Sequence, residues 1–205
     1  MARADRKNAA PELRKKRYGR RPGMLMARST RSTIMSVSMY RATIPVFIRG
    51  LDVLVSLLDK AAAHAKEKGL SDTDMTGARL IDDMLPLSGQ IQRASDTSKM
   101  SAQRLSEVAA PAFDDTETTF AELRERVVKT VAYLKSIDAE TFEGSETRIV
   151  TLKLKNFEPK FSGEDYLFLF ALPNFYFHIV TAYDILRNQG VPVGKMDFLG
   201  AFQAV

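Results

Sequence analysis

A small set of polar residues stands among apolar neighbours in two long helical segments, and these are the candidates for a binding or catalytic site. The set consists of Asp83, Gln90, Asn174, His178, Tyr183 and Arg187. Seven residues separate Asp83 from Gln90, which predicts one shared helix face, and Asn174 lies one turn before His178. Buried polar groups need hydrogen-bond partners, so the cluster is either a small-ligand pocket or a network that fixes helix register. The sequence leaves both interpretations open.

Histidine is scarce in this chain, which limits its metal chemistry. The sequence has two histidines, His64 and His178, and no His-x-x-x-His pair. A site made of His178, Asp83 and His64 would need three helices to converge. We therefore expect no cofactor, with this weak ligand set as the remaining alternative for a divalent metal ion. The simpler prediction is a buried, hydrogen-bonded His178 and a solvent-facing His64 near the end of its helix.

Other catalytic templates are missing from the sequence. There is no cysteine, so thiol nucleophiles, disulfides and thiolate metal sites are excluded. No phosphate-binding glycine loop, Gly-x-Ser-x-Gly elbow or zinc-finger spacing occurs. The neighbouring aspartates at 82–83 and 114–115 diverge and do not make an acid–base pair. No stretch approaches the ~18 consecutive apolar residues of a membrane span, and we expect a cytoplasmic protein.

Four segments with apolar residues every three or four positions predict amphipathic helices. We expect these helices over 40–67 with Pro45 in the first turn, 77–107 with a kink near Asp82–Asp83 caused by Pro86, about 119–137, and 163–189 with a kink at Pro173. Thr119 and Glu122 have capping-box spacing, and Glu122 and Arg126 are spaced as an i,i+4 ion pair. The last helix is apolar nearly all round over 166–180, which predicts that it is the central, most buried helix.

The periodicity changes between residues 141 and 162. Polar and apolar residues alternate over 148–155, which predicts a short β-hairpin or an extended excursion. Short connections between long helices indicate antiparallel neighbours. The predicted fold class is all-α, an up-down-up-down four-helix bundle with this excursion between its third and fourth helices.

Charge is distributed unevenly along the chain. Residues 1–34 hold eleven Lys or Arg against two acidic residues, whereas the other 171 residues hold nineteen basic and twenty-three acidic ones. The basic leader has little surface that could be buried, which predicts disorder. It can be interpreted as a nucleic-acid or membrane arm, a transit peptide, a nuclear signal, or residues upstream of a true start at Met35. We expect one domain over 35–205, and its acidic balance argues against nucleic-acid binding by that domain.

Several stretches resemble a known family. They are 79–87 (RLIDDMLPL), 90–92 (QIQ), 172–178 (LPNFYFH), 181–183 (TAY), 186–187 (LR) and 194–198 (GKMDF). Over roughly 36–202 the chain resembles the uncharacterised domain of unknown function numbered nineteen-ninety-three. That family is similar in fold to the DinB/YfiT-like bundles, some of which use a three-histidine metal site and small-molecule thiols. The resemblance implies a four-helix bundle that is often dimeric, and it implies no reaction.

Three functions follow as hypotheses. The first is a DinB-like protein that binds a small ligand in a polar pocket between the second and fourth helices. The second is a non-catalytic scaffold or interaction protein that forms a homodimer. The third is a divergent metal-dependent enzyme related to thiol transferases, and whether the protein is an enzyme stays open.

Overall fold

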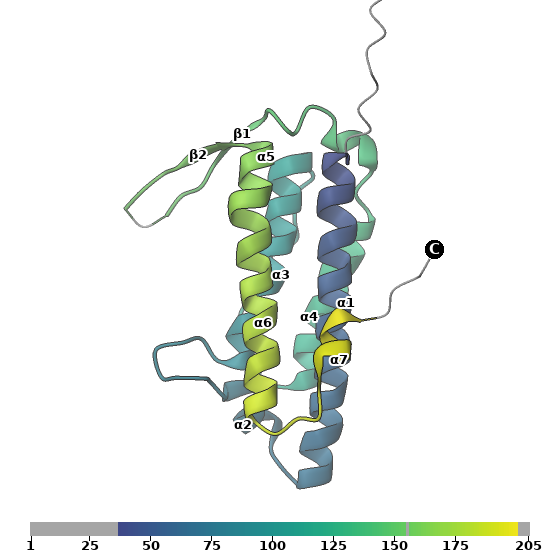
Figure 1. Ribbon diagram of the computed structural model, residues 1–205, viewed down its shortest axis with the longest axis vertical. Coiled ribbons are helices and arrows are strands. Elements are labelled where there is room, and N and C mark those ends of the chain that lie inside the picture. Colours follow the sequence, from purple (N-terminus) through teal and green to yellow (C-terminus); the bar gives the residue numbers. More distant parts are fainter. Residues whose placement is uncertain (1–36, 155, 201–205) are drawn as a thin grey trace, which may run out of the picture. The chain divides into compact units, whose positions relative to one another are not determined.

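The computed structural model describes residues 37–154 and 156–200 (Figure 1). The predicted basic leader over 1–34 lies outside these described residues. The first helix, α1, spans Met39–Lys68; the Ser38 side chain accepts a hydrogen bond from the Arg41 backbone at its start, and Gly69 ends it with φ of 65°. Pro45 lies inside α1, so the prediction that it belongs to the first turn is wrong, although the helix begins within one residue of the predicted start.

The second predicted helix begins ten residues later than expected. A short helix, α2 (Asp72–Gly77), is followed by an irregular loop over 78–86, and α3 spans Leu87–Ser106. Pro86 is the N-cap residue of α3, a position that tolerates proline because no intrahelical bond uses its missing N–H. The predicted kink at Asp82–Asp83 is therefore wrong, since both residues belong to the loop.

The next helix, α4 (Phe120–Lys135), begins where predicted. Its N-cap Thr119 accepts from the Glu122 backbone, and the Glu122 carboxylate accepts from the Thr119 backbone, which completes the capping box. Between α3 and α4 lies a linker over 107–119 with little regular structure.

The linker reverses the chain direction that we predicted for the last two helices. The Tyr133 hydroxyl near the end of α4 donates to the Val108 carbonyl at the start of the linker (2.8 Å), and Thr76 of α2 donates to the Thr118 carbonyl at its end (2.8 Å). The linker thus runs along the bundle, and α3 and α4 are parallel (Figure 1). The four-helix, all-α prediction is confirmed, but the directions follow a down-up-up-down order.

The predicted excursion is a short hairpin. After the 3-10 turn η1 (Ala139–Phe142), strand β1 (Ile149–Thr151) pairs antiparallel with β2 (Lys160–Ser162), with Val150 opposite Phe161. The hairpin leads into Gly163, where a Cβ atom would lie 1.8 Å from the Ser145 carbonyl oxygen. Only glycine fits this close backbone approach.

The last long helix is continuous but irregular. It consists of α5 (Gly163–Asp165), the π-helical turn η2 (Tyr166–Ala171) and α6 (Leu172–Asn188), and the short α7 (Lys195–Leu199) follows. The wide turn immediately precedes Pro173, whose ring cannot accommodate regular α-helical bonding to the preceding turn. Among the described residues, the helix over 163–188 is the one that is long and apolar enough to cross a membrane by length and composition. In its most apolar 18-residue stretch, 44% is buried in the bundle.

The core is built from all four long helices. Phe175 packs edge to face on Phe47 at 4.8 Å, where Gly50 lets α1 approach α6. The apolar stretch over 166–180 does not make this helix the most buried one, contrary to the prediction: Leu169 is 68% exposed, Phe177 56% and Val180 41%. Apolar composition did not indicate burial here, because one face of the helix has no neighbour among the described residues.

Candidate functional site

Two predicted site residues meet between α3 and α6. His178 Nδ1 lies 2.8 Å from Gln90 Oε1, and Gln90 Nε2 donates to the Leu85 carbonyl at 3.1 Å. Because the amide nitrogen of Gln90 is the donor to Leu85, its oxygen is the acceptor, so His178 Nδ1 carries the proton. This pair fixes the tautomer of His178 and joins the loop over 78–86 to the fourth helix.

The His178 ring is neutral. Burial, the larger cause, and the nearby charge of Arg93 together lower its pKa from 6.5 to about 4. With Nδ1 protonated, Nε2 carries a free lone pair, and it makes no hydrogen bond to the described part of the chain. His178 therefore presents a hydrogen-bond acceptor and, at neutral pH, no charge.

We call the contact region between α3 and α6 around Gln90 and His178 the seam. Asn174 also belongs to it, but Asp83 does not. Asn174 Nδ2 donates to Thr97 Oγ1 at 2.9 Å, about one turn from the His178–Gln90 pair. Asp83 is exposed in the 78–86 loop, so the helix face that it was expected to share with Gln90 does not exist. The error followed from extending α3 through Pro86.

The other two predicted residues point to a different part of the bundle. The Tyr183 ring packs on Phe198 of α7 with centroids 5.8 Å apart, and Arg187 donates to the Val193 carbonyl at 2.9 Å. Both stabilise the return of the chain into α7. The six candidates therefore divide into a seam group of Gln90, Asn174 and His178, the exposed Asp83, and a tail group of Tyr183 and Arg187.

A three-histidine metal site does not fit these residues. The seam offers one imidazole, an amide oxygen that already accepts from it and a hydroxyl, with Arg93 nearby. His64 is half-buried towards the end of α1, near Gly190. Across 37–154 and 156–200 no three His, Cys, Asp or Glu side chains come together as a metal site. Divalent ions prefer several nitrogen or carboxylate donors, and the nearby guanidinium opposes them.

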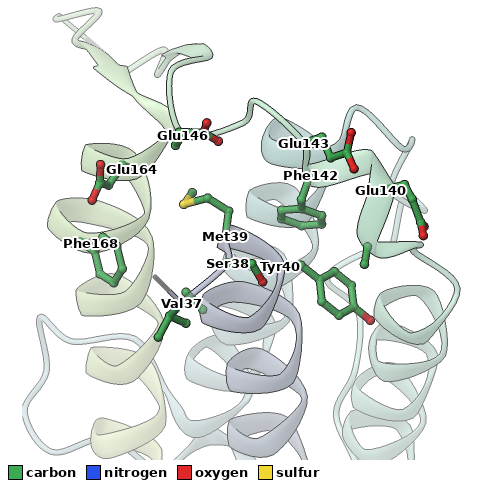
Figure 2. A pocket seen from close by; sticks show the side chains of 12 residues that line it. Val37, Ser38, Met39, Tyr40, Glu140, Phe142, Glu143, Glu146, Glu164 and Phe168 are labelled. Carbon is green, nitrogen blue, oxygen red and sulfur yellow. The ribbon is translucent and has the colours of Figure 1, made fainter. Parts of the chain in front are cut away.

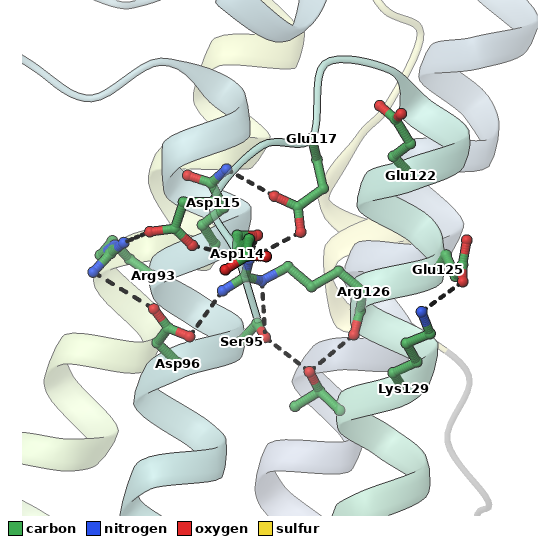
Figure 3. Close-up of polar contacts among 12 residues, drawn as sticks. Arg93, Ser95, Asp96, Asp114, Asp115, Glu117, Glu122, Glu125, Arg126 and Lys129 are labelled. Carbon is green, nitrogen blue, oxygen red and sulfur yellow. Dashed lines mark hydrogen bonds and ion pairs between the residues drawn. The ribbon is translucent and has the colours of Figure 1, made fainter. Parts of the chain in front are cut away.

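A large polar cluster centres on Arg126, which we expected to pair with Glu122. Its side chain is 2% exposed and lies 2.8 Å from Asp96 and 2.9 Å from both Asp115 and Glu117 (Figure 3). Its Nη1 also donates to the Asp114 carbonyl. Glu122, the expected partner, instead caps α4.

Two further cations balance the charge of this Arg126 cluster. Lys99 lies 3.1 Å from Asp96, and Arg93 bridges Asp96 and Asp115. Phe113 covers the cations, with its ring centre 5.3 Å from the Arg126 guanidinium carbon and 5.2 Å from Lys99. Three cations and three carboxylates thus fasten the linker to α3 and α4, which is a structural role.

Glu117 is held in its ionised form within the cluster. Burial alone raises its pKa, but hydrogen bonds from Arg126 and Gln92 outweigh burial and bring the pKa below its ordinary value. The sequence indicated the burial of Arg126 in one way only, because this arginine lies three residues after Leu123, within the apolar stripe of α4. Its carboxylate partners lie nine to thirty residues away in the sequence, which periodicity does not reveal.

An uncharged surface runs along the outside of the last long helix. We call it the outer helix face, and it consists of Leu169, Pro173, Phe177 and Val180, spaced three or four residues apart and all exposed. No charged residue occurs between Asp165 and Asp184. The 78–86 loop adds exposed Leu80, Ile81 and Leu85 next to Gln90.

The fold and this seam place the protein in the class of DinB-like four-helix bundles. The chain is similar to a crystal structure of a DinB family member protein from Shewanella denitrificans, with 37% sequence identity and a TM-score of 0.76 over 81% of this chain and 94% of that one. The family model described as Domain of unknown function (DUF1993) matches residues 39–199, and the chain belongs to that family. No curated protein matches.

Proposed function

We propose that this protein is a non-catalytic binding protein that works as a homodimer, with the outer helix face as the subunit interface. The observation that carries the proposal is the exposure of Leu169 and Phe177 on a helix with no charge from 166 to 183. An apolar surface of this kind on a helical bundle favours a protein partner. Two copies of the same helix can pack this face against itself about a two-fold axis.

The position of the uncharged stretch is compatible with a second copy as the partner. The charges that bound it are both acidic, Asp165 at one end and Asp184 at the other. In an antiparallel pair they would lie at the rim, where water screens them, and the apolar residues would lie at the centre. A stable interface needs about 800 Å² from each partner, so the loop residues Leu80, Ile81 and Leu85 would have to contribute.

The state of association tests this proposal. Sedimentation of the full chain at micromolar concentration should give about twice the monomer mass of 22.9 kDa. Leu169→Glu with Phe177→Glu should give the monomer, because buried unpaired charges oppose association. Val128→Glu is the matched control, since Val128 is 44% exposed on α4, and it should stay dimeric.

A monomeric wild-type chain overturns the proposal. Vesicle flotation of the same protein distinguishes the reason: binding to vesicles that Phe177→Glu abolishes would make the outer helix face a membrane surface. The structure describes one apolar helix of membrane-spanning length, and the chain is similar to a protein whose crystal structure is known. Both observations favour a soluble protein, and we propose that it is cytoplasmic.

A small ligand at His178 is the second candidate, and the free Nε2 lone pair favours it. A ligand there would donate a hydrogen bond to Nε2 and cover its apolar neighbours, among them Phe177, whose ring lies 5.3 Å from that of His178. Titration of the ¹⁵N-histidine-labelled chain with phenol tests this, because a hydrogen bond donated to Nε2 should move its ¹⁵N signal upfield while Nδ1 stays protonated. An unchanged Nε2 signal removes this candidate, whatever the state of association.

A further inference from the structure

A cavity of about 700 Å³ opens at the end of the bundle where α1 begins (Figure 2). Its walls come from three parts of the chain: the start of α1, the η1 turn with the segment after it, and the α5–η2 part of the last helix. The apolar lining consists of Val37, Met39, Tyr40, Phe142 and Phe168. A space of this size accommodates a small organic molecule.

Part of this lining is apolar surface left open to solvent. Phe168 is 49% exposed and Val37 is 70% exposed, whereas Phe142 is buried and supports the edge of the Tyr40 ring at 5.6 Å. Phe168 projects from the π-helical turn, where the backbone departs from regular α-helix. Single π-helical turns are frequent at functional sites, and here the turn places an aromatic ring at the cavity.

The polar part of the lining has one sign of charge. Glu140, Glu143, Glu146 and Glu164 line the cavity, and none of the four has an ion-pair partner within the described residues. The Glu164 N–H donates to the Glu146 carbonyl at 3.1 Å, which brings these two residues side by side. In Figure 2 they lie on the side of the cavity where Met39 and Phe168 also lie.

We propose that this cavity binds an organic cation with an apolar body, of the alkylammonium class. The ammonium group would lie by Glu146 and Glu164, where unpaired carboxylates attract positive charge and reject anions. The apolar body would cover Met39 and the open face of Phe168, and an aromatic face next to a cation adds a cation–π attraction. Neither an acid nor a neutral chain of the same length satisfies both parts of the lining.

Three probes with one apolar body and different charge test this assignment. The full chain, labelled with ¹³C at its methionine methyl groups, is titrated with octylammonium, 1-octanol and octanoate, all below their aggregation limits. The Met39 methyl signal reports on the cavity, and Met196, which is 62% exposed on α7, reports on non-specific binding. Octylammonium should shift Met39 in a saturable way, with an affinity about tenfold above that of octanol, and octanoate should not shift it.

Matched variants separate local attraction from net charge. Glu146→Gln with Glu164→Gln should weaken octylammonium binding about tenfold and leave octanol unchanged. Glu67→Gln with Glu125→Gln removes the same net charge on other surfaces and should bind octylammonium like the wild type. Equal affinities for octylammonium and octanol, an unaffected Met39 signal, or equal losses in both double variants would each overturn the proposal.

Discussion

Replacing Arg126 by methionine should lower the stability of the bundle far more than its position on α4 suggests. The side chain is 2% exposed, and methionine fills a similar volume without the charge. The cost arises from the groups left behind. Asp96 keeps Lys99 and Arg93 as partners, and Asp115 is 39% exposed, so water screens it.

Glu117 carries most of the expected loss. Its side chain is 12% exposed, and without Arg126 its remaining partner among the described side chains is the Gln92 amide at 2.9 Å. Breaking a buried ion pair from one side costs about 3–5 kcal/mol. Because the other two carboxylates keep solvent or cations, we expect about 3 kcal/mol, which lowers the melting temperature by roughly 6–12 °C for a domain of this size.

Urea unfolding followed by far-ultraviolet circular dichroism measures this loss. Arg124→Met on the same helix is the control, because Arg124 and Asp59 form a pair with both side chains about half exposed, and it should cost less than about 0.5 kcal/mol. A loss below about 1 kcal/mol for Arg126→Met, or equal losses for the two variants, would refute the reasoning.

The pH dependence gives an independent check on Arg126. Its hydrogen bond helps to keep the pKa of Glu117 below the ordinary value, so the resulting stabilisation is complete above the unfolded-state pKa of about 4.3. It is lost as the pH falls through the folded-state pKa. The stability difference between wild type and Arg126→Met should therefore narrow below about pH 4, and a constant difference would contradict the assignment.

Two further variants test other parts of the structure. His178 has a pKa of about 4 in the fold against 6.5 in the unfolded chain, so its contribution is complete above pH 6.5 and declines by up to about 3 kcal/mol as the pH falls to 4. His178→Asn should remove this decline in urea unfolding, His64→Asn should retain it, and equal pH profiles for the three proteins would sink the idea. Gly163→Ala should cost about 3 kcal/mol, because its Cβ meets the Ser145 carbonyl oxygen. Gly194→Ala has open space and should be near neutral in thermal unfolding; similar costs would show that the backbones separate easily.

Features that depend on neighbouring residues were predictable from the sequence. The Thr119–Glu122 capping box and the hairpin both follow from local spacing and are confirmed. The sequence also grouped Gln90 with His178, because polar residues in apolar stripes need partners, but it did not single out the contact between them. The binding roles of these side chains remain predictions.

Features that depend on distant segments were not predictable. The linker over 107–119 could have been a short turn or a crossover, since thirteen residues are long enough to run along a helix. The choice between them depends on Arg126, whose partners at 96, 115 and 117 come together only in the folded bundle. Likewise, the apolar surface of the last helix did not reveal that Leu169 and Phe177 lie outside the core.

The central claim is that two copies of this chain meet along the outer helix face, and cysteine cross-linking tests it most directly. The natural sequence has no cysteine, so single cysteines at Leu169, Pro173, Phe177 and Val180 can be compared one at a time under mild oxidation. The proposal predicts a disulfide-linked dimer at one or two neighbouring positions of this set, and none for Val128→Cys on α4. Equal cross-linking at Val128, or none anywhere along the face in protein that sediments as a dimer, would contradict it.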